Sequence, residues 1–318
     1  MFNITVLDGH PMNPGDLSWE PMKELGHLRV YPRTNTDEVV ARSADADVLV
    51  INKIKITENL LDSLPRLKFI CVSATGYNVV DMQAACKHGV IVSNVPSYST
   101  ASVAQSVFAH LLNVTNRVDA YATQNRQGMW SESPDFTYLN LPCTELSGKV
   151  IGIVGLGHIG RAVSSIAISL GMKVWAYTSK RKEDLPDGVE KKSLDELFAG
   201  ADVVSLHCPQ TQETFGMVNR KRLAQMKPTS ILINTARGGL IDESAVAEAL
   251  KYGTISAFCA DVLYEEPPKS DNPLLNLENA YITPHIAWAT CEARERLMAV
   301  CVKNVDAFIK GKPINVVS

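Results

Sequence analysis

The stretch 149–182 constrains the fold more than any other part of the sequence. It opens with the apolar run 150–154, continues with the pattern Gly-X-Gly-X-X-Gly at 155–160, and closes with a second apolar run at 174–177. An apolar-periodic segment ending at Gly171 separates the two runs, so the predicted order is strand, tight turn, helix and strand. A βαβ unit with glycines in its first turn is typical of a dinucleotide-binding fold.

Each glycine of this pattern has its own physical task. Gly155 permits the tight turn, Gly157 lets the backbone approach a pyrophosphate, and Gly160 lets the helix pack closely on the strand. Unpaired N–H groups at the start of the helix, at His158 and Ile159, then face the anion. A glycine-rich turn in an unrelated α/β protein is the alternative, which the flanking strand and helix disfavour.

The residue that follows the second strand of this unit departs from the NAD pattern. That pattern has an Asp or Glu about 20 residues past the glycines, which accepts hydrogen bonds from the adenosine ribose. Here Thr178 and Ser179 are followed by three cations, of which Lys180 is the first. Because no carboxylate repels a 2′-phosphate, the local chemistry favours NADP(H), with NAD(H) as the alternative. A solvated basic turn that contacts nothing is the other interpretation.

Length and composition limit the number of domains and the classes of partner that the chain can have. A chain of 318 residues suits two domains of ordinary size. The formal net charge of −3 gives no reason to expect nucleic-acid or membrane partners, and no apolar stretch reaches membrane-spanning length. The seven cysteines are scattered without a CxxC pair, so neither a disulfide framework nor a metal site is predicted. Together with an N-terminus unlike a signal peptide, they favour the cytoplasm.

The first 97 residues alternate short apolar runs with helical patterns. Expected strands lie at 4–7, 28–31, 48–51, 67–72 and 90–92, and expected helices lie at 36–42, 57–64 and 80–87. Strands separated by helices imply parallel pairing, so we predict a doubly wound, flavodoxin-like α/β domain without a glycine pattern of its own.

The rest of the chain predicts a second domain inserted into the first. Apolar spacing predicts one long bridging helix at 100–127, in which His110 is interpreted as a packed or partner-contacting histidine. Further strands are expected at 203–206, 231–234, 255–259 and 281–282, and helices at 194–198, 220–225, 243–251 and 291–309. Six strands complete a Rossmann domain at 100–288, and the last helix returns to a discontinuous domain made of 1–99 and 289–318.

Polar side chains follow three strands of the second domain. Arg237 follows the fourth strand, Glu266 the fifth and His285 the sixth. Because ligands bind at the carboxyl ends of parallel strands, we expect the three to meet beside a nicotinamide. Histidine can exchange a hydroxyl proton, glutamate can orient it, and arginine can bind a carboxylate or polarise a carbonyl. Taken singly, the arginine and glutamate could form a surface ion pair, and the histidine could cap a helix or lie in a loop.

With other segments in the same order, these residues resemble the D-isomer-specific 2-hydroxyacid dehydrogenase family over essentially the full chain. The matching segments are 74–78, 102–105, 155–160, 207–209, 234–238, 261–267 and 283–285. The resemblance implies that the split domain binds the substrate, that a cleft lies between the domains, and that the subunits form a homodimer through their dinucleotide domains.

The resemblance also implies roles for individual residues. Arg237 would bind the substrate and His285 would be the acid/base, with Glu266 as its partner. Backbone N–H groups of Thr75 and Gly76 would hold the substrate carboxylate. Lys53 is a further candidate for substrate binding, and the cofactor would be contacted by His207, Cys208, Pro209, Thr214, Thr235, Ala236 and, through the nicotinamide carboxamide, Asp261.

Two departures from the family pattern point to one branch of it. Thr178 resembles the residue found in the NADPH-using glyoxylate/hydroxypyruvate reductases, and the segment ending at Trp288 resembles glycerate dehydrogenases. This tryptophan could equally pack without touching substrate.

The leading hypothesis is reduction of hydroxypyruvate or glyoxylate to D-glycerate or glycolate. The alternatives are a D-3-phosphoglycerate dehydrogenase, for which Lys53 and Lys55 are the candidate phosphate-binding cations, and a non-catalytic nucleotide-sensing protein like the dehydrogenase-related corepressors.

Overall fold

The computed structural model describes residues 1–317 and divides into two compact units. Among the described residues, unit 1 comprises 1–99 and 288–317, and unit 2 comprises 100–287. The chain therefore leaves unit 1 and later returns to it. The predicted boundaries differ from this division by one residue at the return.

Unit 1 is built on a parallel five-stranded sheet in the order β2-β1-β3-β4-β5. Its strands are β1 (Phe2–Val6), β2 (Gly26–Val30), β3 (Val48–Ile51), β4 (Phe69–Val72) and β5 (Ile91–Ser93). Its helices are α1 (Glu20–Lys23), η1 (Thr36–Glu38), α2 (Val39–Ser43), α3 (Glu58–Asp62), α4 (Met82–Lys87) and α11 (Cys291–Ile309). This is the flavodoxin-like strand order. The α/β, doubly wound class predicted for this part of the chain is confirmed.

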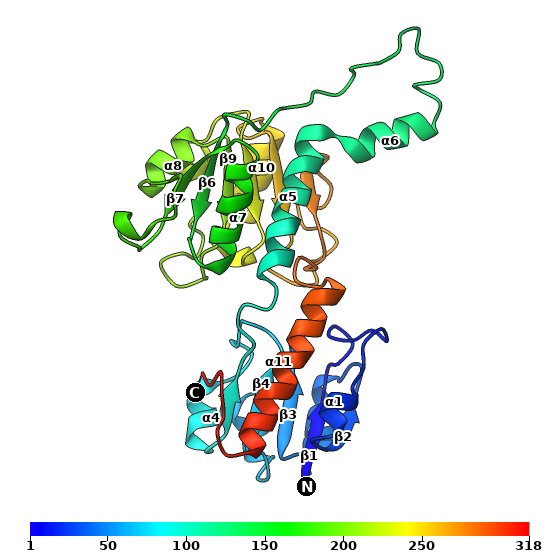
Figure 1. Cartoon of the computed structure of the whole chain (residues 1–318), viewed down its shortest axis with the longest axis vertical. Helices are drawn as coiled ribbons and strands as arrows, with labels where there is room; N and C mark the ends of the chain where they lie inside the picture. Colours follow the sequence, from blue (N-terminus) through cyan, green and yellow to red (C-terminus); the bar gives the residue numbers. More distant parts are fainter. Residues whose placement is uncertain (318) are drawn as a thin grey trace. The chain divides into compact units, whose positions relative to one another are not determined.

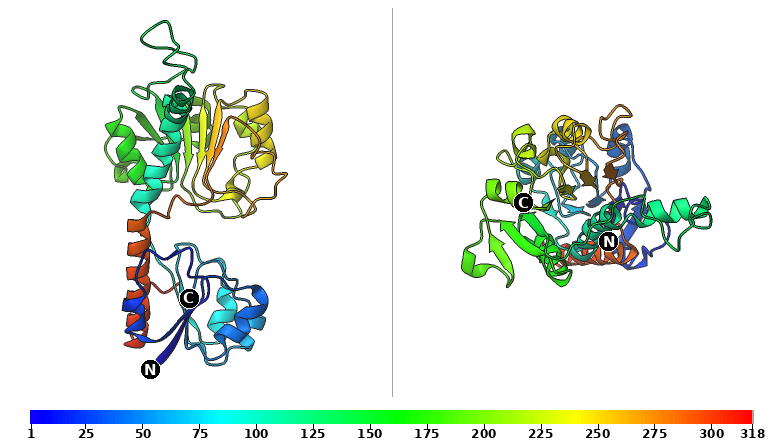
Figure 2. Two further views of the ribbon diagram at one scale, coloured as in Figure 1. Left: turned by 90° about the vertical axis from the view of Figure 1, so that its right-hand side faces the viewer. Right: turned by 90° about the horizontal axis from the view of Figure 1, so that it is seen from above.

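The two faces of this sheet are covered by different helices, because successive strand residues point to opposite sides. Ile70 packs in the cluster beneath α3 and α4, whereas Phe69 packs in the cluster that contains α11. Phe308 of α11 stacks on Phe69 with ring centroids 4.5 Å apart. Figures 1 and 2 show α11 along one face of the sheet, where α1 also packs, and α2, α3 and α4 cover the other face. The last helix thus belongs to the core of unit 1.

Unit 2 contains a parallel seven-stranded sheet in the order β12-β11-β10-β9-β6-β7-β8. The strands are β6 (Val150–Val154), β7 (Lys173–Tyr177), β8 (Val189–Lys191), β9 (Val203–Leu206), β10 (Ile231–Asn234), β11 (Ala257–Ala260) and β12 (Ala280–Ile282). The helices are α5 (Thr100–Asn116), α6 (Val118–Arg126), α7 (His158–Ser169), η2 (Lys182–Asp184), α8 (Leu194–Gly200), α9 (Arg220–Leu223), η3 (Gly238–Leu240) and α10 (Glu243–Lys251). Six of these strands have the Rossmann order and β12 extends the sheet.

Helices cover both faces of this sheet, as the left view of Figure 2 shows. On one side α5 and α7 contribute Val107, Leu111 and Val163 to a buried cluster. On the other side α8 and α10 contribute Leu197 and Val246 to a second cluster. Both faces of every central strand are therefore buried, which explains why the sequence shows continuous apolar runs instead of alternation.

Three sequence-based expectations were wrong in detail. The predicted helix 100–127 is two helices, because Arg117 adopts a left-handed conformation with φ of 55° and separates α5 from α6. The sheet has seven strands and not six, because the edge strand β8 is three residues long and carries two exposed charged residues. The short helix α1 was also missed. Four residues are too few to establish a helical period.

Candidate active site

The predicted site residues of unit 2 lie along one edge of its sheet, the edge formed by the carboxyl ends of the strands. Because all seven strands are parallel, their carboxyl ends lie on the same side. The segments that follow β6, β7, β9, β10, β11 and β12 begin at Gly155, Thr178, His207, Thr235, Asp261 and Thr283. The fold therefore places six groups of predicted residues along this edge.

The glycine turn after β6 has the geometry of a phosphate-binding loop. Gly155 has a φ of 99°, and a Cβ on it would lie 2.7 Å from the backbone of His207. A Cβ on Gly160 would lie 2.2 Å from the carbonyl oxygen of Gly155. In contrast, a Cβ on Gly157 would meet nothing within 4 Å, so the space beside it is open. Helix α7 starts here without a side-chain cap, which leaves its first N–H groups available to an anion.

The segment after β9 is held rigidly beside this turn. The Nε2 atom of His207 lies 2.9 Å from Oγ of Ser205, and burial lowers the pKa of His207 to about 4. The hydroxyl of Thr214 donates to the carbonyl of Pro209 at 2.8 Å and accepts from the N–H of Thr211 at 2.7 Å. This segment therefore presents a neutral imidazole and an ordered loop, and not a cation, to a bound dinucleotide.

The arginine after β10 is carried by an ordered turn. Buried Asn234 accepts from the N–H of Ala236 at 3.1 Å and donates to the carbonyl of Arg237 at 2.9 Å. The exposed guanidinium of Arg237 donates to the carbonyl of Ala236 at 2.7 Å. The buried hydroxyl of Thr235 has no partner in the described part of the chain. An orphaned hydroxyl at a strand end fits a site that is completed by a polar ligand.

Gly238 brings the arginine turn against the loop that carries Glu266. A Cβ on Gly238 would lie 2.0 Å from the carbonyl carbon of Leu263 and 2.3 Å from the nitrogen of Tyr264. Only a residue without a side chain therefore allows the two segments to touch. The glycine holds the strand ends of β10 and β11 in register across the site.

We expect Gly238→Ala to separate these segments. Because the added methyl group meets backbone and not a flexible side chain, the free energy of unfolding should fall by about 2 to 3 kcal/mol. The same shift should lower kcat/KM, since Glu266 lies three residues beyond the displaced Leu263. Urea unfolding and steady-state kinetics measure the two effects. Wild-type stability would show that the two segments are not in close contact.

His285 and Glu266 form the central pair of the site. The Nδ1 atom of His285 lies 2.7 Å from one carboxylate oxygen of Glu266, and the other oxygen accepts from the N–H of Leu263 at 3.1 Å. Both side chains are about 30% exposed, at 27% and 31%. Because the carboxylate accepts a hydrogen bond from Nδ1–H, Nε2 is the ring atom left to exchange a proton with a bound molecule.

The loop that carries His285 is held by Asp261. One carboxylate oxygen of Asp261 accepts from the hydroxyl of Thr283 at 2.6 Å and from the N–H of Ile286 at 2.8 Å, and the other accepts from the N–H of Ala287 at 2.8 Å. His285 has a φ of 55°, a conformation that its own side chain disfavours. These contacts on both sides of the histidine stabilise that conformation. Sequence reasoning, which assigned Asp261 to the cofactor, missed this role, because the role depends on contacts with residues 22 to 26 positions away and no local pattern encodes them.

Comparisons with known proteins identify the family of the chain. The family described as D-isomer specific 2-hydroxyacid dehydrogenase, NAD binding domain, matches residues 108–287. The chain belongs to this family. A protein named hydroxypyruvate reductase from Blautia hydrogenotrophica is 43% identical over 99% of both chains. A glycerate dehydrogenase from Methylorubrum extorquens is 40% identical over 88% of both chains.

A solved structure shows the same fold. The structure described as an acyclic imino acid reductase in complex with NADPH and D-Arg superposes with a TM-score of 0.85 at 32% identity, covering 99% of this chain and 100% of that one. The chain is accordingly an oxidoreductase of the 2-hydroxyacid dehydrogenase family, and its unit 2 is the nucleotide-binding domain that the family match covers.

The remaining predicted residues of the dehydrogenase lie at strand ends of unit 1. Lys53 follows β3, and its N–H and that of Asn52 donate to the two carboxylate oxygens of Asp8 at 2.6 and 2.8 Å. Thr75 and Gly76 follow β4, and the hydroxyl of Thr75 donates to the carbonyl of Val95 at 3.0 Å. These loops are ordered by hydrogen bonds, and their part in substrate binding stays a prediction.

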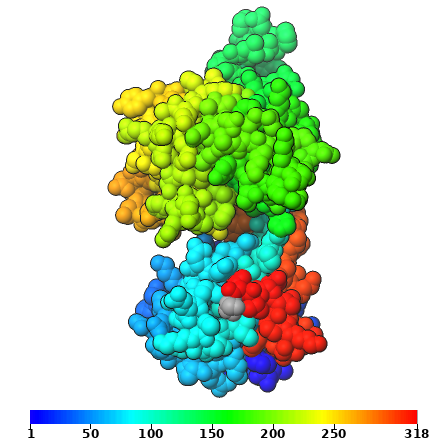
Figure 3. Space-filling view, turned by 90° about the vertical axis from the view of Figure 1, so that its left-hand side faces the viewer, coloured from blue at the N-terminus to red at the C-terminus, as the bar shows by residue number. Residues whose placement is uncertain are grey.

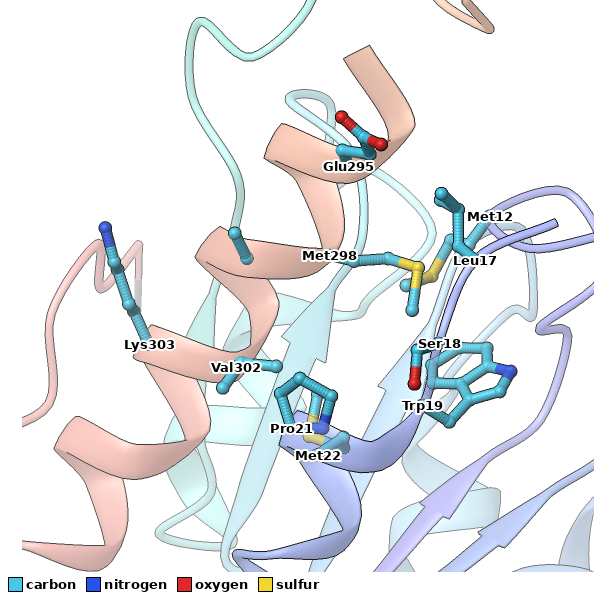
Figure 4. Close-up of a pocket in the computed structure, with 11 residues that line it drawn as sticks. Met12, Leu17, Ser18, Trp19, Pro21, Met22, Glu295, Met298, Val302 and Lys303 are labelled. Carbon is cyan, nitrogen blue, oxygen red and sulfur yellow. The ribbon is translucent and has the colours of Figure 1, made fainter. Parts of the chain in front are cut away.

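A pocket of about 450 Å³ also lies in unit 1, and none of the residues that line it is a predicted site residue. Its lining is mostly apolar, with Glu295 and Lys303 among the charged members. Figure 4 shows Trp19 and three methionines around it, between α11 and the segment that leads into α1.

Trp288 packs edge-on against Tyr98 in unit 1, with ring centroids 6.2 Å apart. This contact favours the packing interpretation of Trp288 over a substrate contact.

Residues 1–317 contain no group of three or more His, Cys, Asp or Glu side chains that could hold a metal ion. Within the same range, no helix is both long enough and apolar enough to cross a membrane.

Proposed function

We propose that this dehydrogenase reduces a small 2-keto acid, hydroxypyruvate or glyoxylate, to D-glycerate or glycolate, with NADPH as the preferred cofactor. The observation that carries the proposal is the 2.7 Å hydrogen bond between His285 and Glu266 at the sheet edge where the glycine turn lies. The names of the two relatives, hydroxypyruvate reductase and glycerate dehydrogenase, support the choice of substrate.

In the proposed reaction, His285 and Arg237 have different roles. The nicotinamide, when bound, supplies the hydride that reaches the keto carbon. His285, protonated and held by Glu266 through Nδ1, gives its Nε2 proton to the keto oxygen, so that the C=O bond becomes CH–OH. Arg237 binds the substrate carboxylate or polarises the keto oxygen before transfer. In the reverse direction the neutral imidazole accepts the hydroxyl proton.

The glycine turn fits the pyrophosphate of the cofactor. The open space beside Gly157 and the uncapped start of α7 provide N–H groups for its oxygens. His158, Ile159 and Gly160 form the first turn of that helix. The orphaned hydroxyl of Thr235 would provide a further polar contact to the cofactor.

The segment after β7 supports a preference for NADPH. Thr178 follows the strand directly, and its hydroxyl accepts from the N–H of Lys180 at 3.2 Å. Arg181 is paired with Asp184 at 2.9 Å, so its charge is partly neutralised within the turn. The ammonium of Lys191 reaches the carbonyl of Lys180. Lys180, Lys182 and Lys191 are therefore the cations on which the binding of a 2′-phosphate would depend.

We expect Thr178→Asp to reverse the cofactor preference. A carboxylate at this position repels a 2′-phosphate and accepts hydrogen bonds from ribose hydroxyls, so the ratio of kcat/KM for NADPH to that for NADH should fall by roughly 10²-fold. Thr178→Val is the matched control, because it has a similar shape and no charge, and it should change the ratio much less. An unchanged ratio in the aspartate variant would mean that this turn does not contact the 2′-phosphate of NADPH.

A substrate panel tests the proposed activity. Oxidation of NADPH and of NADH is followed by nicotinamide absorbance with hydroxypyruvate, glyoxylate, pyruvate and 3-phosphohydroxypyruvate. We expect hydroxypyruvate or glyoxylate with NADPH to give the highest kcat/KM. Highest activity with 3-phosphohydroxypyruvate would favour a phosphoglycerate dehydrogenase. Turnover of none of them would favour a nucleotide-sensing protein and contradict the proposal.

The proposal includes a homodimer formed through unit 2. Helix α6 buries none of its residues, and the loop after it exposes Trp130, Phe136 and Leu139 by 55%, 91% and 87%. Figures 1 and 3 show this arm projecting from the rest of unit 2. An exposed apolar arm of this kind is typical of an interaction surface. Sedimentation at assay concentrations should therefore give a dimer, and a monomer would contradict this part of the proposal.

We also propose the cytoplasm as the location. All seven cysteines are free thiols, and three of them, Cys71, Cys259 and Cys301, are buried. Thiols that remain reduced are typical of a reducing compartment. Fractionation of the native cell checks this location.

A further inference from the structure

Helix α5 carries a buried histidine for which the reaction described above has no use. His110 is 7% exposed, and burial lowers its pKa although the charge of Asp261 acts in the opposite direction. Its Nε2 atom lies 3.2 Å from the hydroxyl oxygen of Thr283. A neutral imidazole on the buried face of α5 is therefore joined to the strand end that leads to His285.

The direction of this hydrogen bond follows from the next one. The hydroxyl of Thr283 lies 2.6 Å from a carboxylate oxygen of Asp261, and a carboxylate can only accept. The single hydroxyl proton therefore points to Asp261, so the hydroxyl oxygen accepts from His110. The imidazole must carry its proton on Nε2. The three residues therefore form a buried chain of hydrogen bonds that all run in the same direction. His110 donates to Thr283, and Thr283 donates to Asp261.

This chain ends at the backbone of the His285 loop. Asp261, which is 2% exposed, accepts from the N–H groups of Ile286 and Ala287, the two residues after His285. A second contact from α5 reaches the same loop, because the hydroxyl of buried Ser102 donates to the carbonyl of Ala287 at 2.6 Å. Helix α5 thus contacts the loop from two points, its first turn at Ser102 and its middle at His110.

We propose that His110 is a positioning residue for His285, acting through Thr283 and Asp261. This inference rests on the proposed function for its kinetic consequence. Donation from His110 orients the Thr283 hydroxyl, the hydroxyl and two N–H groups fix the Asp261 carboxylate, and the carboxylate keeps His285 in its left-handed conformation. The reacting Nε2 atom of His285 then stays aligned with a bound substrate.

Leucine and glutamine variants of His110 test the inference. His110→Leu keeps the bulk and removes the donor, so kcat should fall by roughly 10-fold to 10²-fold because the acid/base is misaligned, while the KM for NADPH stays within about twofold. His110→Gln keeps an N–H donor near the position of Nε2 and should recover most of kcat. A glutamine variant as slow as the leucine variant, at equal melting temperature, would overturn the inference.

Thr283 provides an independent pair of variants if those at position 110 fold poorly. Thr283→Val should lower kcat as His110→Leu does, Thr283→Ser should not, and the double variant His110→Leu/Thr283→Val should be no slower than the slower single variant. Thr115→Val is the matched control, since the hydroxyl of this buried threonine of α5 bonds to near neighbours in the chain, the carbonyl of Leu111 and the side chain of Asn116. Additive losses in the double variant would contradict a shared chain of hydrogen bonds.

Hydrogen exchange separates this inference from the proposed function. The amides of Ile286 and Ala287 should exchange faster in His110→Leu than in wild type, with protection of α10 unchanged and with wild-type exchange in His110→Gln. Unchanged exchange at both amides in His110→Leu would overturn the inference. If wild type reduces no 2-keto acid, the proposed function fails, and the exchange comparison still decides whether His110 positions the loop.

Discussion

Replacing His285 by alanine should lower kcat by roughly 10²-fold or more while leaving the affinity for NADPH nearly intact. The expected loss follows from the geometry: Nδ1 is held by Glu266 at 2.7 Å, so Nε2 is the atom that exchanges the proton, and alanine has no replacement for it. Glu266→Gln should lower kcat less, because its amide oxygen can still accept a hydrogen bond from Nδ1–H. Steady-state kinetics and titration of NADPH fluorescence measure the two quantities.

His27→Ala is the matched control for this variant. His27 is an exposed histidine on β2 of unit 1 and lies outside the proposed site, so its removal should leave kcat unchanged. Wild-type kcat in His285→Ala, with a structure that is otherwise intact, would contradict the acid/base assignment. A loss of NADPH affinity equal to the loss of kcat would instead assign His285 to cofactor binding.

Replacing Arg237 by alanine should mainly weaken the use of substrate. A guanidinium that binds a carboxylate through charge-assisted hydrogen bonds contributes about 1.5 to 3 kcal/mol for each bond, so kcat/KM should fall by roughly 10²-fold, with a raised KM for the 2-keto acid. Arg237→Lys keeps the charge without the planar fork and should lie between alanine and wild type.

Arg220→Ala is the control for charge alone. Arg220 is an exposed arginine of unit 2 that pairs with Glu248, so its loss removes a cation of the same unit outside the site. It should leave kcat/KM unchanged. An equal effect of the two alanine variants would mean that Arg237 acts only through the general field of unit 2, and an unchanged KM in Arg237→Ala would remove it from substrate binding.

The sequence predicted the parts of the fold that depend on local patterns. Continuous apolar runs identified the central strands β6, β9 and β10, because strands buried on both faces are apolar throughout. The glycine spacing at 155–160 identified the turn, because two of its glycines contact backbone and the third faces open space. Elements without such a pattern were missed, as with the polar edge strand β8 and the left-handed break at Arg117.

The site was predictable where it depends on topology and not where it depends on side-chain contacts. Placement of Arg237, Glu266 and His285 at one sheet edge follows from parallel strands alone. The link from His110 through Thr283 to Asp261 joins a helix to two strand ends, and no periodicity encodes a contact across 173 positions. Helical spacing could indicate only that His110 lies on the inner face of α5.

The chirality of the glycerate formed from hydroxypyruvate tests the central claim most directly. The claim is that this chain transfers hydride and proton to a 2-keto acid at the His285 and Glu266 pair and gives the D product of its family. The wild-type protein, supplied with NADPH and hydroxypyruvate, should form D-glycerate in an amount equal to the NADPH oxidised. Formation of L-glycerate, or no oxidation of either NADPH or NADH, would contradict the account.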